Sequence, residues 1–353
     1  MAMSRRSVTL VTAAGLVVLL GLLAALLPVP YVVLVPGPVT DTLGSIGSTQ
    51  VISVTGAKTY GTDGHLYLTT VGVIPGSCDH DPTLQEALRA WFAKHEAVEP
   101  KQVICPPGQS SKSVAAQNAG EMSQSQQDAV TAALLYLHYK PQTLHLTVGD
   151  VTPDSPAADV LQPNDVIFAV DGHAVSTADA LRSRISSHAP GQQVTLTIAH
   201  NGVRQDVQAK VVRDPTTHRS ILGFQVDQRA TFNNVDVHIG IDPNSVGGPS
   251  AGLMFTLGII DKLTPGQLAG GRTVAGTGTI DGFGQVGPIG GIQQKIAAAA
   301  DAGATVFLAP ASECADARTA APKSLQLVRV DTLATAVGAL QAIAAGRTDF
   351  PRC

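Results

Sequence analysis

A run of 20 uncharged, mostly apolar residues near the N-terminus, Val8 to Leu27, constrains this chain more than any other feature. Twenty helical residues span about 30 Å, the thickness of the hydrocarbon core of a bilayer. A secretory signal peptide has a shorter apolar core, of about 7 to 15 residues, followed by a small-residue cleavage site. Here the run ends in Leu26, Leu27 and Pro28 without an Ala-x-Ala pattern. The run predicts an uncleaved membrane anchor, with a signal peptide as the alternative.

The charges around this run predict its orientation. Arg5 and Arg6 precede it, and the next basic residue is Lys58. Basic residues flank the cytoplasmic end of a membrane helix. We therefore expect a single-pass protein of the cell membrane, with a cytoplasmic N-terminus and with the rest of the chain outside the cytoplasm.

The cysteines agree with an oxidising compartment. They are four, an even number, at Cys78, Cys105, Cys314 and Cys353, and none belongs to a CxxC motif. Zinc-ribbon and thioredoxin-type sites therefore lack their signature. Three disulfide pairings are open, and the local one, Cys78 with Cys105 and Cys314 with Cys353, is favoured because each pair flanks one segment. The alternative is four buried thiols.

Composition excludes several classes of protein. The 353 residues are 44% hydrophobic and 14% charged, which is too apolar for an intrinsically disordered chain. The net charge is -4 and no cluster of Lys and Arg occurs, so the basic surface of a nucleic-acid-binding protein is missing. A GxxxxGK[ST] string is also missing, so we expect no bound nucleotide. We expect neither a cofactor nor a metal.

The stretch from residue 31 to residue 140 predicts a mixed α/β segment. Tyr31 to Val35 and Leu66 to Val71 are rich in β-branched or aromatic residues and bounded by Gly and Pro, which predicts strands. Apolar residues recur at helical spacing between Pro82 and His95 and again from Met122 to Tyr139. Between these helices, Pro106 to Gly120 is rich in Ser, Gln, Gly and Pro, which predicts a loop.

The next stretch alternates strand and turn signals. It contains an alternating strand from Leu144 to Val148, a helix start at Asp154 to Ala157, a strand from Val166 to Val170 with the turn Asp171-Gly172, a helix cap at Thr177, and the hairpin turn Asn201-Gly202. This order, with the strings Ser155-Pro156-Ala157 and Val170-Asp171-Gly172, resembles a bacterial PDZ domain over residues 141–213.

The PDZ resemblance implies binding of extended peptides by strand addition to an open sheet edge. A loop of the Gly-Leu-Gly-Phe type, which receives a free carboxylate, is not recognisable between Tyr139 and Leu144. Recognition of free C-termini is therefore not expected. A purely structural PDZ domain is the alternative.

A glycine-rich string near the C-terminus presents a serine at a helix start. The string Gly247-Gly248-Pro249-Ser250-Ala251-Gly252 opens a predicted helix. The first N-H groups of a helix are unpaired and lie at its positive end, so they favour an anion. The alternative is that Ser250 merely caps this helix.

A second string, Gly290-Gly291-Ile292-Gln293-Gln294-Lys295, starts another predicted helix. Helical spacing puts Lys295 on the apolar stripe of Ile292 and Ile296. Burial lowers the pKa of a lysine, so a neutral Lys295 could take the proton of a nearby serine hydroxyl. The alternative is that the amine of Lys295 reaches solvent past the apolar stripe.

These two strings, in this order, strongly resemble the proteolytic domain of the Lon peptidases. On that resemblance Ser250 matches the family nucleophile and Lys295 the general base, while backbone N-H groups in the segment Gly248, Pro249, Ser250 and Ala251 hold the oxyanion. Thr277 matches a threonine that helps to position the dyad.

His238 matches a histidine that precedes the nucleophile segment of the Lon family. Two positions depart from the family pattern: an acidic residue is frequent where Thr279 stands, and a second histidine where Asp236 stands. These departures concern residues that support the dyad. Ser250 and Lys295 themselves match the family pattern.

The complete layout resembles the membrane-anchored PDZ and Lon-like serine proteases. It implies an α+β protein with a tail and transmembrane helix at residues 1–30, a mixed extracytoplasmic segment at 31–140, a PDZ domain at 141–213 and a Lon-type proteolytic domain at 230–350. The resemblance implies an ATP-independent endopeptidase that cuts exported or membrane-associated proteins, with the PDZ domain presenting the substrate, and a homo-oligomeric ring.

The rival hypothesis is a catalytically inert PDZ receptor or scaffold of the cell envelope that binds exported peptides. Retention of both Ser250 and Lys295 in their strings favours the enzyme.

Overall fold

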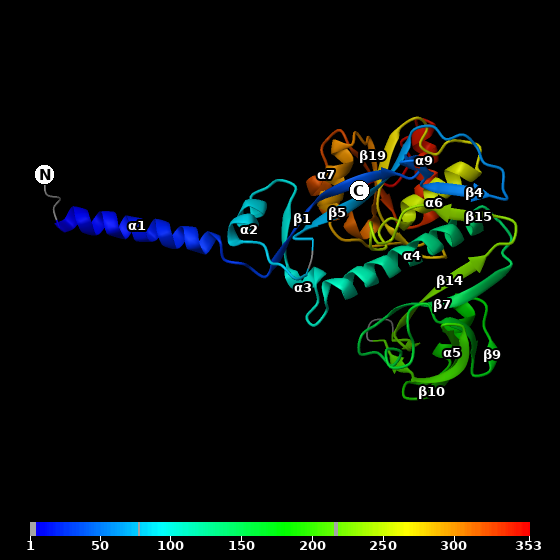
Figure 1. Ribbon diagram of the computed structural model, residues 1–353. Helices are drawn as coiled ribbons and strands as arrows, with labels where there is room; N and C mark the ends of the chain where they lie inside the picture. Colours follow the sequence, from blue (N-terminus) through cyan, green and yellow to red (C-terminus); the bar gives the residue numbers. More distant parts are fainter. Residues whose placement is uncertain (1–4, 77, 215–217) are drawn as a thin grey trace.

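The computed structural model describes residues 5–76, 78–214 and 218–353. Its N-terminal helix α1, Arg5–Ala25, projects away from the rest of the chain (Figure 1). Within the described residues, α1 is the one helix long and apolar enough to cross a membrane, and none of its apolar stretch, Val8–Ala25, is buried. A signal sequence near the N-terminus would satisfy the same criteria.

A six-stranded sheet forms the centre of the larger body, in the order β20-β19-β16-β5-β1-β6. Its strands are β1 (Tyr31–Asp41), β5 (His65–Ile74), β6 (Ala97–Pro100), β16 (Thr273–Gly276), β19 (Val306–Pro310) and β20 (Gln326–Val330). Strand β16 pairs in parallel with β5 and β19, whereas β1 is antiparallel to β5 and β6. Strands from the predicted 31–140 segment and from the C-terminal third therefore share one sheet.

Helices cover both faces of this sheet. One face carries α4 (Ser111–Tyr136), α6 (Gly252–Leu263) and α9 (Leu333–Ala344), and the other carries α7 (Ile292–Asp301) and α8 (Cys314–Ala320), which follows the short 3-10 turn η1 (Ala311–Glu313). The short helices α2 (Leu84–Trp91) and α3 (Lys101–Ile104) contact β1 and β6. Leu308 of β19 packs into the core with α4, α6 and α9, and its neighbour Phe307 packs with α7 and α8. This alternation is expected of a strand buried on both sides.

Helix α4 begins inside the stretch predicted as a loop, Pro106 to Gly120, so that prediction is confirmed up to Ser110 and wrong from Ser111 onward. The Ser110 side chain accepts a hydrogen bond from the Ser113 N-H and caps the helix. The first turns of α4 are mostly exposed and lack the apolar face that made its second half, from Met122, recognisable.

A second sheet has the order β11-β10-β8-β7-β14, with β9 paired to β8. Its strands are β7 (Thr143–Val151), β8 (Val166–Val170), β9 (His173–Ala174), β10 (Gln193–His200), β11 (Val203–Lys210) and β14 (Phe224–Thr231), with helix α5 (Ala178–Ser186) beside them. The predicted hairpin turn holds, since Asn201 and Gly202 both have positive φ. Thr177 caps α5, as predicted.

The predicted helix start at Asp154 to Ala157 is wrong, because this stretch forms only turns. Leu161 N-H donates to the Ala157 carbonyl at 2.8 Å, but no helix continues from there. Pro163 disfavours the helical conformation at the residue before it.

Short strands complete the fold. They are β2 (Ser45–Ile46), β3 (Thr49–Gln50), β4 (Ile52–Thr55), β12 (Val212–Arg213), β13 (Ser220–Ile221), β15 (Asp236–Ile239), β17 (Thr279–Ile280) and β18 (Val286–Gly287). Strand β4 pairs with β15, and β17 forms a hairpin with β18.

Two disulfides tie local segments together. Cys78 bonds to Cys105 and Cys314 bonds to Cys353. The second bond joins the start of α8 to the last residue of the sequence. This is the pairing that the cysteine spacing favours.

Candidate active site

Ser250 lies in the turn that leads into α6. Its carbonyl oxygen accepts two hydrogen bonds, from the Gly278 N-H at 2.9 Å and from the Thr277 hydroxyl at 3.1 Å. The Ser250 hydroxyl has no hydrogen-bond partner among the described residues, and the N-cap of α6 is Ala251. Ser250 is therefore held by its backbone, does not cap the helix, and keeps its hydroxyl available.

Lys295 is buried on α7, with 3% of its surface exposed. Its Nζ donates to the hydroxyl of Thr277 at 3.1 Å. Burial lowers the pKa of Lys295 to about 7, against a weaker opposite effect of Glu313. Near neutral pH a large share of Lys295 is thus the neutral amine, which can accept a proton. The alternative that its amine reaches solvent does not hold.

Thr277 joins Lys295 to the Ser250 turn. It follows β16, is completely buried, and its N-H donates to the Leu308 carbonyl at 3.2 Å. Its hydroxyl accepts from Lys295 and donates to the Ser250 carbonyl. In the described part of the chain, Lys295 and the Ser250 hydroxyl are not hydrogen-bonded to each other, so Thr277 is the link between them.

The N-H groups predicted to hold an oxyanion are not equally available. The Gly248 N-H donates to the Asn118 carbonyl of α4 at 2.9 Å, so the expectation for Gly248 does not fit this structure. Pro249 has no N-H to donate. The N-H groups of Ser250 and Ala251 have no acceptor among the described residues and stand at the start of α6, where a negative charge is favoured.

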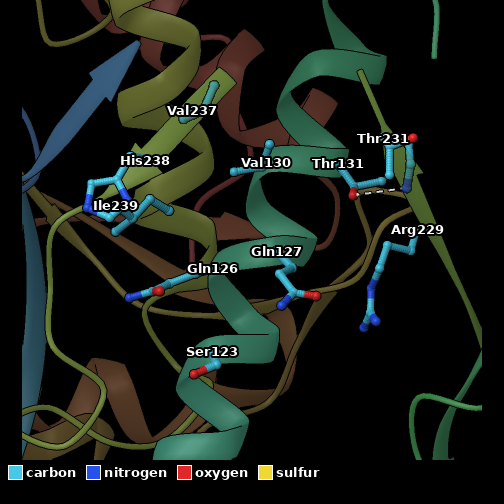
Figure 2. A pocket seen from close by; sticks show the side chains of 11 residues that line it. Ser123, Gln126, Gln127, Val130, Thr131, Arg229, Thr231, Val237, His238 and Ile239 are labelled. Carbon is cyan, nitrogen blue, oxygen red and sulfur yellow. Dashed lines mark hydrogen bonds between the residues drawn. The ribbon is translucent and has the colours of Figure 1, made fainter. Parts of the chain in front are cut away.

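His238 is not brought together with the other three site residues. It lies on β15 opposite Ser53 of β4, and it is exposed. Figure 2 shows His238 at a pocket of about 500 Å³ that Gln126 of α4 also lines. Across the residues that the structure describes, His238 makes no hydrogen bond to Ser250, Thr277 or Lys295.

A cavity of about 910 Å³ opens beside Pro249, the neighbour of Ser250. Its walls come from α4, from the β17–β18 hairpin and from strands β7 and β14 of the second sheet. The cavity therefore lies where the second sheet meets the Ser250 turn. It has the size of a site for a small ligand or a short peptide segment.

Four carboxyl groups in this cavity wall were not predicted. They are Glu121, Asp128, Asp227 and Asp281. Burial raises the pKa of Asp128 to about 8 and of Asp281 to about 6, and it also raises the pKa of Asp227. The sequence does contain a signal for the burial of Asp128, because helical spacing puts this residue on the same face of α4 as the buried Ala132.

The string Ile221-Leu222-Gly223-Phe224, which was not predicted as a carboxylate loop, resembles the Gly-Leu-Gly-Phe pattern. It leads into β14, Leu222 is buried and Gly223 has a φ of +88°. The segment from Tyr139 to Leu144 leads into β7 instead. Strand β14 pairs with β7 although it follows it by about 70 residues, so the loop lies beside β7 in space.

Two family models match the chain. The PDZ domain matches residues 126–211, and the Lon protease (S16) C-terminal proteolytic domain matches residues 206–340. Lon protease 2 of Herpetosiphon aurantiacus is 40% identical over 87 residues, which are 24% of this chain and 10% of that protein. Lon protease of Roseiflexus castenholzii is 31% identical over 149 residues, 41% of this chain and 18% of that protein.

A solved structure, the PDZ domain of an SdrC-like protein from Listeria monocytogenes, is 26% identical with a TM-score of 0.23, and the match covers 25% of this chain and 92% of that one. The chain spans less than a fifth of the length of the Lon proteases named above. The PDZ match precedes the Lon match along the chain, which is the order that the motifs predict. They show a PDZ-like region followed by a Lon-type proteolytic region in this mixed α and β chain, and they support a PDZ plus Lon-type protease family.

Proposed function

We propose that this protein is an ATP-independent serine endopeptidase with Ser250 as nucleophile and Lys295 as general base. The observation that carries the proposal is the buried Lys295, whose pKa is lowered to about 7 and whose amine is hydrogen-bonded to Thr277. The same Thr277 holds the Ser250 carbonyl. ATP independence rests on the missing GxxxxGK[ST] string.

The reaction begins when the free Ser250 hydroxyl turns toward Lys295 and attacks the scissile carbonyl. Lys295 accepts the hydroxyl proton, and the N-H groups of Ser250 and Ala251 stabilise the oxyanion. The C-N bond then breaks, Lys295 gives its proton to the leaving amine, and an acyl-serine remains. Water, losing a proton to Lys295, hydrolyses this ester, and the proton returns to Ser250.

The cellular setting is part of the proposal. Helix α1 anchors the protein in the cell membrane, and the two disulfides suit an extracytoplasmic location. Substrates are exported or membrane-associated proteins, and the PDZ domain presents them by strand addition. Assembly into a homo-oligomer is expected from the Lon resemblance.

Cleavage of an unfolded polypeptide tests the function. The full chain in detergent should cut denatured casein at the same rate with and without ATP, and Ser250→Ala should not cut it. An inactive wild-type protein that still binds peptides would instead support the PDZ receptor or scaffold. Undiminished cleavage by Ser250→Ala would exclude Ser250 as the nucleophile.

A further inference from the structure

Strand β14 of the second sheet contacts the candidate active site through one turn. The turn Asp281 to Gly284 connects β17 to β18. The Gly282 N-H donates to Asp227 Oδ1 at 2.7 Å, and the Gly282 carbonyl accepts from Gln228 Nε2 at 2.8 Å. Asp227 and Gln228, which are neighbours in β14, thus bind the N-H and the carbonyl of Gly282.

The contact is also a close approach of two backbones. A Cβ atom added at Gly282 would clash with the carbonyl oxygen of Gln228. The rest of the turn is fixed by Asp281, whose Oδ1 accepts from the N-H groups of Phe283 at 3.0 Å and Gln285 at 2.7 Å. The turn is therefore stiff, and its place depends on β14.

The contact occupies part of the outer edge of β14. Gln228 N-H donates to Asp227 Oδ1, and Ala230 N-H donates to the hydroxyl of Thr131 on α4 at 3.3 Å. The other edge of β14 pairs with β7. Residues 225–227 of β14 line the cavity beside Pro249. One end of β14 thus faces the cavity while the other end is fixed to α4 and to the turn.

The hairpin held by this turn belongs to the cavity wall. Strand β17 begins two residues after Thr277, and Thr279, Val286 and Pro288 line the same cavity as Pro249. Thr277 itself has separate hydrogen bonds to Leu308 and to Ser250. A shift of the hairpin would therefore change the cavity wall and leave the link between Lys295 and Ser250 in place.

We propose that Asp227 and Gln228 are positioning residues of the protease, which hold the β17–β18 hairpin so that a polypeptide can lie in the cavity beside Ser250. This proposal rests on the proposed function of Ser250 and Lys295. The second sheet then has two roles: it forms part of the proteolytic site, and its free edge can bind a peptide.

The hydrogen-bond role of Asp227 is separable from its charge. Asp128, Asp281 and Glu121 are further carboxyl groups at the cavity, and Arg229, two residues further along β14, is a cation that acts on Asp227. Asparagine at position 227 keeps an oxygen that accepts from the Gly282 and Gln228 N-H groups, and it removes the negative charge. Alanine removes both.

The test compares two reactions of the full chain in detergent. A small fluorophosphonate probe reports the reactivity of Ser250, and denatured casein reports the use of the cavity by a polypeptide. In Asp227→Ala and Gly282→Ala, casein cleavage should fall at least tenfold, whereas the labelling rate of Ser250 stays within twofold of wild type. Asp227→Asn should restore casein cleavage.

Gly338→Ala is the matched control, because Gly338 is exposed on α9 and a Cβ there meets nothing within 4 Å. It should cut and label like wild type. Equal casein cleavage in Gly282→Ala and wild type would overturn the proposal, as would Asp227→Asn being as impaired as Asp227→Ala. A wild-type protein that does not label at Ser250 would contradict the proposed function itself.

If Gly282→Ala does not fold, as judged by its melting curve, Asp227→Ala against Asp227→Asn still decides the question. These two variants differ by the carboxamide group, whose oxygen can accept a hydrogen bond from the Gly282 N-H. Parallel loss of casein cleavage and of Ser250 labelling in Asp227→Ala would assign these residues to general stability and overturn the positioning role.

Discussion

The apolar surroundings of Lys295 make its amine a base near neutral pH. The side chain lies on the apolar face of α7 with Ile292 and Ile296, and its amine has one hydrogen bond, to Thr277. Desolvation disfavours the charged form, which lowers the pKa to about 7 from the model-compound value of 10.5. The same burial opposes folding, because the unfolded chain binds a proton that the folded chain binds weakly.

Replacement of Lys295 by methionine should abolish cleavage and leave the protein as stable as wild type at pH 7, or more stable by about 1 to 4 kcal/mol, because each unit of the lowered pKa corresponds to about 1.4 kcal/mol. Between pH 7 and 10.5 the unfolded wild type carries more protons than the folded form, so its stability rises with pH in this window. The advantage of Lys295→Met should therefore shrink as the pH rises. Urea unfolding at several pH values measures it, and a large loss of stability would mark Lys295 as a paired structural cation.

Thr277 can be tested with two substitutions of similar size. Thr277→Val keeps the shape but leaves Lys295 and the Ser250 carbonyl without their shared hydroxyl, so we expect kcat to fall about 100-fold. Thr277→Ser keeps the hydroxyl and should retain most of the activity. Steady-state cleavage of a fluorogenic peptide compares them, and equal rates in both variants would remove the hydroxyl from the mechanism.

At the scale of elements, three segments far apart in the sequence meet at one point. The turn before α6 supplies Ser250, the end of β16 supplies Thr277 and α7 supplies Lys295. The parallel pairing of β5, β16 and β19 fixes the end of β16 between its neighbours. Thr277 is thereby held at the buried C-terminal end of a central strand, between the Ser250 turn before α6 and Lys295 on α7.

Local sequence features predicted the elements that carry the chemistry. Glycine-rich helix starts and a lysine on an apolar stripe are visible within ten residues, so the strings of Ser250 and Lys295 could be recognised. The bond of the Gly248 N-H to Asn118 and the contact of Gly282 with Gln228 could not, because each joins residues more than 50 positions apart. The exposed first half of α4 was missed since it has no apolar periodicity.

The two disulfides should each stabilise the fold by about 3 to 4 kcal/mol on the chain-entropy relation, because they close loops of 27 and 39 residues. Urea unfolding of Cys78→Ser/Cys105→Ser and of Cys314→Ser/Cys353→Ser against wild type measures each contribution. Peptide mapping without reduction checks the pairing. Four free thiols in oxidatively folded protein would contradict it.

At the scale of the whole molecule, the larger body carries Ser250 and Lys295, and the second sheet lines the cavity beside Ser250. Helix α4 lies between the larger body and the second sheet and contacts both, through α6 and through β14 (Figure 1). Helix α1 packs against little of the rest, and its apolar surface remains exposed. Exposed apolar surface of this extent needs a membrane or another apolar environment.

The anchor hypothesis predicts that the mature protein sediments with membranes and keeps its original N-terminus. Protease added to intact protoplasts should digest the part after α1, because the hypothesis places that part outside the cytoplasm. Immunoblotting with antibodies to each end follows the digestion. Soluble protein in the medium with a new N-terminus between Val29 and Val35 would show that α1 is a signal sequence.

The most direct test of the account is labelling of Ser250 by a fluorophosphonate across a range of about pH 5 to 9. Wild type should label at Ser250 with a rate that rises around a midpoint near pH 7, the pKa to which burial lowers Lys295. Ser250→Ala should not label, and Lys295→Met should label at a small, pH-independent rate. Labelling of Ser250 at an equal rate with and without Lys295, or at another residue, would contradict the Ser-Lys dyad.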